Sequence, residues 1–308
     1  MRTNTEGDFA DLTRSALRLL AVGLAAVFLV PDVAAAQGRG NGRANQPAIP
    51  VRGVTSNVAT SAPAGASELS AAPIPQFGSW LDDASTPAKG TGYTGIGVGY
   101  WRGLGDSSGV AQVDVPVLGF TYGMTNRVQV SATVPFYRAT YQGITARGVD
   151  DVYLSGKVAA IDPAVTGRFG LAVGGVVEVL SVGRADQSRV QWALPVSVEF
   201  RADPVRVYGS TGYFSRGAVF AAGAIEWTAS TGTSVTTSLA QSISTASTPV
   251  SVSPRNDLRE ISVFVAHPLS DRLRAYAGVG RTFASGAAGA DAMTLSGGIS
   301  VSFSAAQP

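Results

Sequence analysis

The chain has 308 residues, of which 45% are hydrophobic and 14% charged, and its formal net charge is +2. Soluble domains carry roughly 25% charged residues, so this composition favours a protein whose outer surface faces lipid. The small net charge and the absence of basic clusters argue against a nucleic-acid partner. The absence of cysteine excludes disulfides, thiol catalysis and cysteine-ligated metals.

The first 36 residues have the organisation of a secretory signal peptide. Arg14 and Arg18 precede an apolar run over 19–30, and the alanines at 34–36 supply an A-x-A cleavage site. The run is shorter than the about 20 residues of a transmembrane helix, which favours cleavage over a retained signal anchor. No later run reaches 18 apolar residues. If the mature chain enters a membrane, it must therefore do so as a closed barrel.

Residues 37–89 are rich in Gly, Ala, Ser, Asn and Pro, a composition typical of disordered linkers. We expect this segment to be a periplasmic linker. Bulky side chains occur in it only from Phe77 to Asp83, with the sequence FGSWLDD. This stretch is a candidate for a short turn at the mouth of a barrel.

From Thr91 onward, apolar residues alternate with polar or small ones. Between Arg189 and Arg201, every even position is apolar and every odd position is polar or small. A period of two gives each strand one apolar face, and segments of about ten residues suit tilted membrane strands. Twelve such segments lie at 91–102, 111–123, 127–137, 149–160, 169–182, 188–201, 205–215, 217–228, 233–243, 257–267, 273–283 and 291–303.

The sequence therefore predicts an all-β fold, a transmembrane antiparallel up-and-down β-barrel of about 12 strands over 90–304, with 305–308 as a short tail. Short turns alternate with longer loops, except near Arg216. Because periplasmic turns are short in outer-membrane barrels, both termini are expected in the periplasm. A soluble β-sandwich is the alternative, but its strands are shorter and its outer face is charged. The longer loops are predicted at 103–110, 138–148, 183–187, 244–256 and 284–290.

Aromatic residues at the apolar, outward-facing positions of the strands predict two girdles, since amphipathic rings favour membrane interfaces. The residues near the loops are Tyr100, Phe136, Trp192, Tyr213 and Phe283. Those near the turns are Phe169, Phe200, Trp227 and Phe303. Four further aromatics depart from this pattern because they lie in mid-strand, namely Tyr153, Tyr208, Phe264 and Tyr276.

The charged residues at the opposite, inward-facing positions of the strands are predicted to line the lumen. A basic group facing lipid at the bilayer midplane costs about 2–4 kcal/mol, whereas a lumen offers water or a partner. These ten charges either select small solutes or hold the barrel's shape as ion pairs, and their mixed signs indicate no ion preference. They are Asp114, Asp151, Lys157, Glu178, Glu199, Arg201, Arg206, Glu226, Glu260 and Arg274.

Residues for enzyme chemistry are sparse. His267 is the single histidine, next to Pro268 at a predicted turn, and one histidine without cysteine is a poor zinc ligand set. The glycine run at 95–99 lies inside a strand, so it is no phosphate loop. We therefore predict no enzyme activity and no catalytic, cofactor or metal site. An enzyme would depend on His267 alone.

The segment Gly148 to Ile161, GVDDVYLSGKVAAI, resembles a stretch of the outer-membrane family named for the MetA-pathway of phenol degradation. Gly148, Asp151, Leu154 and Lys157 match its Gly-x-x-Asp pattern, while Val158 and Ala159 replace its usual aromatic residue. The likeness extends loosely over 90–303 and also includes the strand at 128–137 and the turn at 270–273. It implies a barrel that transports hydrophobic or aromatic compounds.

We therefore predict an outer-membrane channel or transporter for small solutes. Its expected partners are outer-membrane lipid, the barrel assembly machinery and a small-molecule solute. The alternative is a barrel without transport, structural or adhesive, that uses the loops at 138–148 and 244–256.

Overall fold

The structure is a computed structural model, and it describes residues 81–104, 110–141, 144–179, 190–215, 217–244, 258–284 and 292–304. The predicted signal peptide, the predicted linker up to residue 80 and the short C-terminal tail lie outside these ranges. So does most of the loops predicted at 103–110, 183–187, 244–256 and 284–290. No helix in the described part of the chain is long and apolar enough to cross a membrane.

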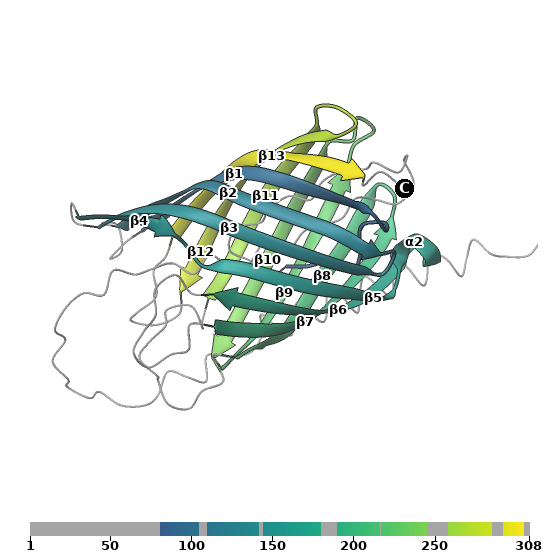
Figure 1. Cartoon of the computed structure of the whole chain (residues 1–308), viewed down its shortest axis with the longest axis horizontal. Coiled ribbons are helices and arrows are strands. Elements are labelled where there is room, and N and C mark those ends of the chain that lie inside the picture. The colour runs from purple at the N-terminus through teal and green to yellow at the C-terminus, as the bar shows by residue number, and fades with distance from the viewer. Residues whose placement is uncertain are drawn as a thin grey trace, which may run out of the picture. The chain divides into compact units, whose positions relative to one another are not determined.

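The described residues form thirteen strands and one short helix (Figure 1). In chain order they are β1 (Thr91–Gly103), β2 (Val110–Thr125), β3 (Val128–Tyr141), β4 (Ile144–Val149), β5 (Val152–Ile161), α2 (Pro163–Thr166), β6 (Phe169–Val179), β7 (Val190–Ala202), β8 (Val205–Phe214), β9 (Ala218–Thr228), β10 (Ser234–Ser244), β11 (Leu258–Pro268), β12 (Leu273–Ala284) and β13 (Ala292–Ser304).

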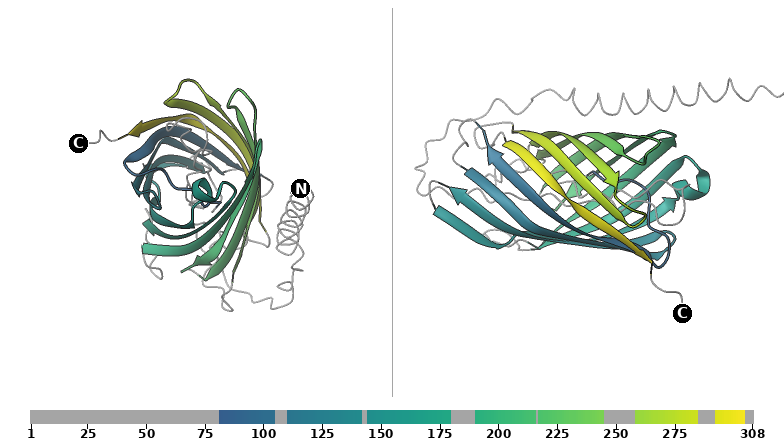
Figure 2. Two further views of the ribbon diagram at one scale, coloured as in Figure 1. Left: turned by 90° about the vertical axis from the view of Figure 1, so that its right-hand side faces the viewer. Right: turned by 90° about the horizontal axis from the view of Figure 1, so that it is seen from above.

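The strands close into an antiparallel barrel, because β1 pairs with both β2 and β13. Figure 2 shows this ring in the view along the barrel. Twelve strands form the wall and match the twelve predicted segments, so the predicted fold is confirmed. The thirteenth strand, β4, pairs with the C-terminal half of β3.

The loop predicted at 138–148 was wrong in its extent. β3 continues to Tyr141 and β4 starts at Ile144, so most of the region is a paired hairpin. β5 then pairs with the first half of β3. β4 and β5 are thus one wall strand interrupted at Asp150 and Asp151. The alternation indicated no strand there because Arg138 and Arg147 occupy the outer face, where apolar residues were expected.

The two ends of the barrel differ in their connections. At one end, here the turn end, short connections join β2 to β3, β7 to β8, β9 to β10 and β11 to β12, and α2 joins β5 to β6. Asp162 caps α2 by accepting a hydrogen bond from the Ala164 amide at 2.8 Å. The opposite end is here the loop end. There β8 and β9 are joined through only 215–217, which explains the interrupted rhythm near Arg216.

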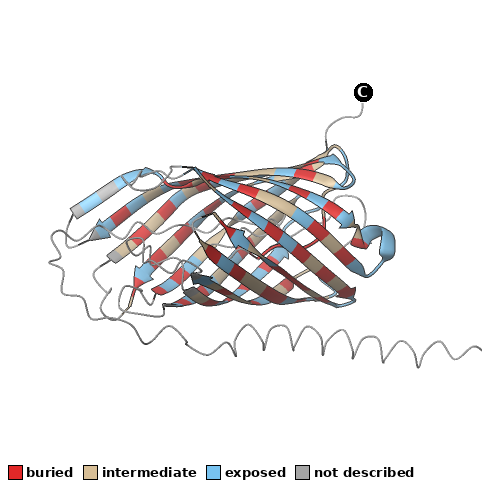
Figure 3. Ribbon diagram, turned by 90° about the horizontal axis from the view of Figure 1, so that it is seen from below, coloured by how far each residue is buried: buried red, intermediate tan, exposed pale blue. Residues whose placement is uncertain are grey.

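Burial alternates along the strands (Figure 3). The exposed positions carry most of the large apolar side chains, and the buried positions carry most of the polar ones. The nine predicted girdle aromatics all have exposed or half-buried outward side chains. The four aromatics that departed from the girdle pattern are buried inside the barrel. They are mid-strand because they belong to the lumen, so they do not weaken the girdle prediction.

Two of the inward rings pack closely against glycines of the wall. A Cβ on Gly278 would collide with the ring of Phe264, and the hydroxyl of Tyr276 lies against Gly97 and Gly298. Glycine is needed at these positions because a side chain there would push the ring away from the wall. The arrangement keeps bulky rings close to the strands.

Candidate functional site in the barrel lumen

The ten charges predicted to line the lumen all lie on the inner face. Nine are buried and Arg274 is half-buried. The structure brings five of them together near the turn end, where they surround a piece of the chain. The five are Lys157, Glu199, Arg201, Arg206 and Glu226.

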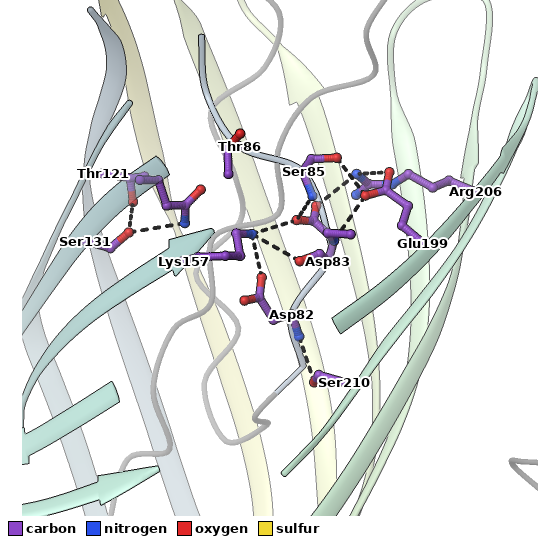
Figure 4. A network of polar contacts seen from close by, with 12 residues as sticks. Asp82, Asp83, Ser85, Thr86, Thr121, Ser131, Lys157, Glu199, Arg206 and Ser210 are labelled. Carbon is purple, nitrogen blue, oxygen red and sulfur yellow. Dashed lines mark hydrogen bonds and ion pairs between the residues drawn. The ribbon is translucent and has the colours of Figure 1, made fainter. Parts of the chain in front are cut away.

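That piece is Leu81–Ser85, here called the inner segment, which precedes β1 and lies inside the barrel wall (Figure 4). All five of its residues are buried, and Leu81, Asp83 and Ala84 are completely so. It falls within the range expected to be a disordered linker. Disorder was predicted because residues 37–89 contain few bulky side chains. The inner segment is nevertheless ordered, because polar contacts rather than apolar packing hold most of it.

Lys157 on β5 makes the closest ion pairs to the inner segment. Its Nζ lies 2.9 Å from Asp82 Oδ1 and 3.1 Å from Asp83 Oδ1, and it also donates to the Asp83 carbonyl at 3.1 Å. The Lys157 side chain is only 3% exposed. A single buried ammonium group therefore neutralises much of two buried carboxylates.

Strands β7 and β8, which lie two and three strands along the wall from β5, also hold the inner segment. Arg206 Nη1 lies 3.1 Å from Asp83 Oδ2, and its Nη2 lies 3.2 Å from Glu226 Oε2. Glu199 Oε2 accepts from the Ser85 hydroxyl at 2.6 Å and from the Ala84 amide at 3.2 Å. Arg201 binds Glu199 and also donates to the Ser85 hydroxyl.

Apolar contacts add a smaller anchor. Leu81 packs with Tyr208 and Ala224 inside the barrel. A Cβ on Gly170 of β6 would lie 2.8 Å from the Ala84 Cβ, so the inner segment passes close to the wall there. The inner segment is thus attached to the consecutive strands β5 to β9, along one side of the barrel wall.

The electrostatic environment of Asp82 differs from that of an ordinary aspartate. Burial raises the pKa of Asp82 from its ordinary value of 3.8 to about 7, although the charge of Lys157 lowers it. The neighbouring negative charge of Asp83 adds to the increase. Desolvation favours the neutral acid because the ionised form loses its hydration.

The half of the lumen nearer the loop end has a different charge pattern. Gln112 Nε2 donates to Asp114 Oδ1 at 2.7 Å and to Asp150 Oδ2 at 2.9 Å. Tyr153 donates to Glu178 Oε1 at 2.8 Å. The inward basic residues of the described strands all lie nearer the turn end, so this half is lined by carboxylates. They belong to Asp114, Asp150, Asp151, Glu178 and Glu260.

Sequence reasoning missed Asp82, Asp83 and Ser85 as parts of the site. The bulky stretch that ends at Asp83 was the available signal, but it carried no periodicity that could place it inside the barrel. Asp150 was missed because it lies at the interruption between β4 and β5, where the alternation breaks.

His267 lies apart from the lumen. Its side chain is exposed at the turn end, where Nδ1 is 2.8 Å from the Thr233 hydroxyl. Within the described ranges, no carboxylate pairs with it, and no group of three His, Cys, Asp or Glu side chains is placed to hold a metal ion.

No family model matches the sequence, and no curated protein matches it as a relative. Solved structures do match its fold. The COG4313 outer membrane channel from Pseudomonas putida F1 has a TM-score of 0.51 and 14% identity, covering 72% of this chain and 98% of that one. KdgM porin has a TM-score of 0.48 and 12% identity over 68% and 99%. NanC porin has a TM-score of 0.46 and 12% identity over 68% and 98%.

Proposed function

We propose that the protein is a passive outer-membrane channel for small solutes, closed at its turn end by the inner segment. The observation that carries this proposal is the charged lumen of a twelve-strand wall, where an eight-strand barrel would be filled by side chains. The exposed apolar outer face supports insertion in a membrane. Short turns then face the periplasm, and insertion would use the barrel assembly machinery.

The wall supports a preference among solutes. The inward carboxylates of the described strands include several in the loop half, and their negative charges favour cations over anions by their electrostatic field. The sequence resemblance to the phenol-degradation family adds an expectation of hydrophobic or aromatic solutes. We therefore infer that the preferred solutes are small, aromatic and neutral or cationic.

Proteoliposomes test this function with two aromatic ions of fixed charge. Vesicles containing the full chain should take up benzyltrimethylammonium faster than benzenesulfonate, and empty vesicles should take up neither. A variant in which Asp114 and Glu178 become Asn and Gln should lose most of the difference. Failure of the protein to admit either ion or any small neutral solute would overturn the channel proposal.

A barrel without transport remains the second candidate, because the inner segment occupies the lumen at the turn end. The discriminating result is permeability after that segment is released from Lys157. A barrel that stays impermeable after release would be structural.

Outer-membrane location has its own test. A folded barrel should migrate faster on a gel before heating than after it, and should do so in outer-membrane fractions. Recovery of the protein in the soluble periplasmic fraction would overturn the location and the function together.

A further inference from the structure

The outer face of the barrel carries a sharply restricted set of charges. Among the described strand residues, every charged side chain that points outward is an arginine, and each lies within four residues of the loop end. We call this set the arginine arc. Its members are Arg102, Arg138, Arg147, Arg259 and Arg281.

The strand register spreads the arc over one side of the barrel, from β11 to β4, with β13 and β2 lying between its members. Met293 of β13 is paired with Arg281 of β12 on one side and with Arg102 of β1 on the other. With strands about 4.8 Å apart, the two arginine backbones lie roughly 10 Å from each other. Two strands beyond Arg102, Arg138 of β3 is directly opposite Arg147 of β4.

Directly opposed like charges destabilise a strand pair. Arg138 and Arg147 are both exposed on the same face, because directly paired residues share a face. In the described part of the chain, no carboxylate pairs with Arg102, Arg138 or Arg147. An external anion between the two guanidinium groups would remove this repulsion.

The other side of the barrel shows that the arc is no general girdle. The outward residues of β5 to β10 include no charge among the described positions, and near the loop end they include Val190, Trp192 and Tyr213. The outward basic side chains of the described strands therefore lie on β11, β12, β1, β3 and β4. An anion-binding surface at one side and one height of a lipid-facing wall fits a headgroup bound at a defined place.

We propose that the arginine arc binds the phosphate groups of an outer-leaflet lipid of the lipopolysaccharide type, whose acyl chains lie along the apolar wall below. The proposal rests on the proposed outer-membrane location and orientation. Guanidinium groups suit phosphate because they donate paired hydrogen bonds. The apolar residues beneath the arc, which include Val98, Val279 and Leu295, are exposed for contact with acyl chains.

Native mass spectrometry of the full chain in detergent tests the proposal. The protein is delipidated and titrated with bisphosphorylated lipid A, with the same lipid after removal of both phosphates, and with inorganic phosphate. We expect retention of bisphosphorylated lipid A and at least about tenfold weaker binding of the dephosphorylated lipid, as charge-assisted hydrogen bonds are lost. Inorganic phosphate at the same concentration should not displace the lipid.

The double variant Arg138→Gln and Arg147→Gln should weaken lipid A binding about tenfold. The matched control, Arg127→Gln with Arg272→Gln, changes two exposed arginines at the turn end and should leave binding unchanged. Equal binding of both lipid forms, equal loss in both double variants, or displacement by free phosphate would overturn the proposal. Conductance measured on the same samples separates this result from the channel function, since either can fail alone.

Discussion

The two halves of the lumen share one alternating wall but compensate their charges differently. Near the turn end, Lys157 contacts carboxylates of the inner segment, and Arg206 contacts carboxylates of both the inner segment and the wall. Near the loop end, carboxylates such as Asp114 and Glu178 accept hydrogen bonds from Gln112 and Tyr153. The turn half therefore holds a piece of the chain, whereas the loop half gathers inward carboxylates of the described strands.

The inward or outward position of a residue along its strand therefore does not by itself define the lumen. This position places a charge on the inside, but height along the barrel decides which charges meet. Among the described strands, the inward basic residues lie in the turn half together with carboxylates, while the loop half holds carboxylates. The expectation of no ion preference consequently gives way to a proposed cation preference at the loop end.

Removal of Lys157 should have the largest effect. Lys157→Met leaves Asp82 and Asp83 buried without their ammonium partner, which costs about 3–5 kcal/mol and should release the inner segment. Single-channel recordings in planar bilayers should show higher conductance than the parent. Lys89→Met is the matched control, because that side chain is exposed in the same region of the chain. Unchanged conductance in the Lys157 variant would show that the inner segment does not limit conductance.

The pH dependence of closure should come next. The pKa of Asp82 is about 7 in the docked segment, whereas the ordinary value for an aspartate, expected after release, is 3.8. The raised pKa means that the contribution of the protonated Asp82 carboxyl to docking is fully present below about pH 4 and is lost as pH rises through 7. Open probability should rise at least about tenfold between pH 5 and pH 7. Asp82→Asn should abolish that change, and an opposite pH trend would refute the assignment.

The packing of rings on the wall predicts a middle-sized effect. Gly278→Ala forces the Phe264 ring away from β12, which should lower stability by about 1–3 kcal/mol. Gly119→Ala is the control, because a Cβ there has no neighbour within 4 Å. Thermal unfolding in detergent measures both. Equal melting temperatures would show that the ring does not depend on glycine.

The smallest effect concerns selectivity. Asp114→Asn should reduce the ratio of potassium to chloride permeability a few-fold, as one fixed charge leaves the loop half. Asp271→Asn, at an exposed turn, should leave the ratio unchanged. Reversal potentials in a potassium chloride gradient give both ratios. A preference for chloride in the parent would contradict the proposed role of the loop half.

Much of the wall could be predicted from sequence because alternation is a local property. Val190 to Ala202 shows its two faces without any knowledge of its neighbours, and ten lumen charges follow from the same rule. The contacts of Asp82 and Asp83 could not be predicted, since residues more than seventy positions apart meet there. β4 was missed because Arg138 and Arg147 place charges on the outer face, where the alternation rule expects apolar residues.

Closure of the channel by the inner segment can be tested with a reversible tether. The chain has no cysteine, so Ala84→Cys with Gly170→Cys introduces a single pair. A Cβ on Gly170 would lie 2.8 Å from that of Ala84, and a shift of about 1 Å reaches disulfide geometry. Combined with Lys157→Met, the oxidised pair should hold conductance low and reduction should raise it. Equal, high conductance in the oxidised and reduced states would contradict closure by this segment.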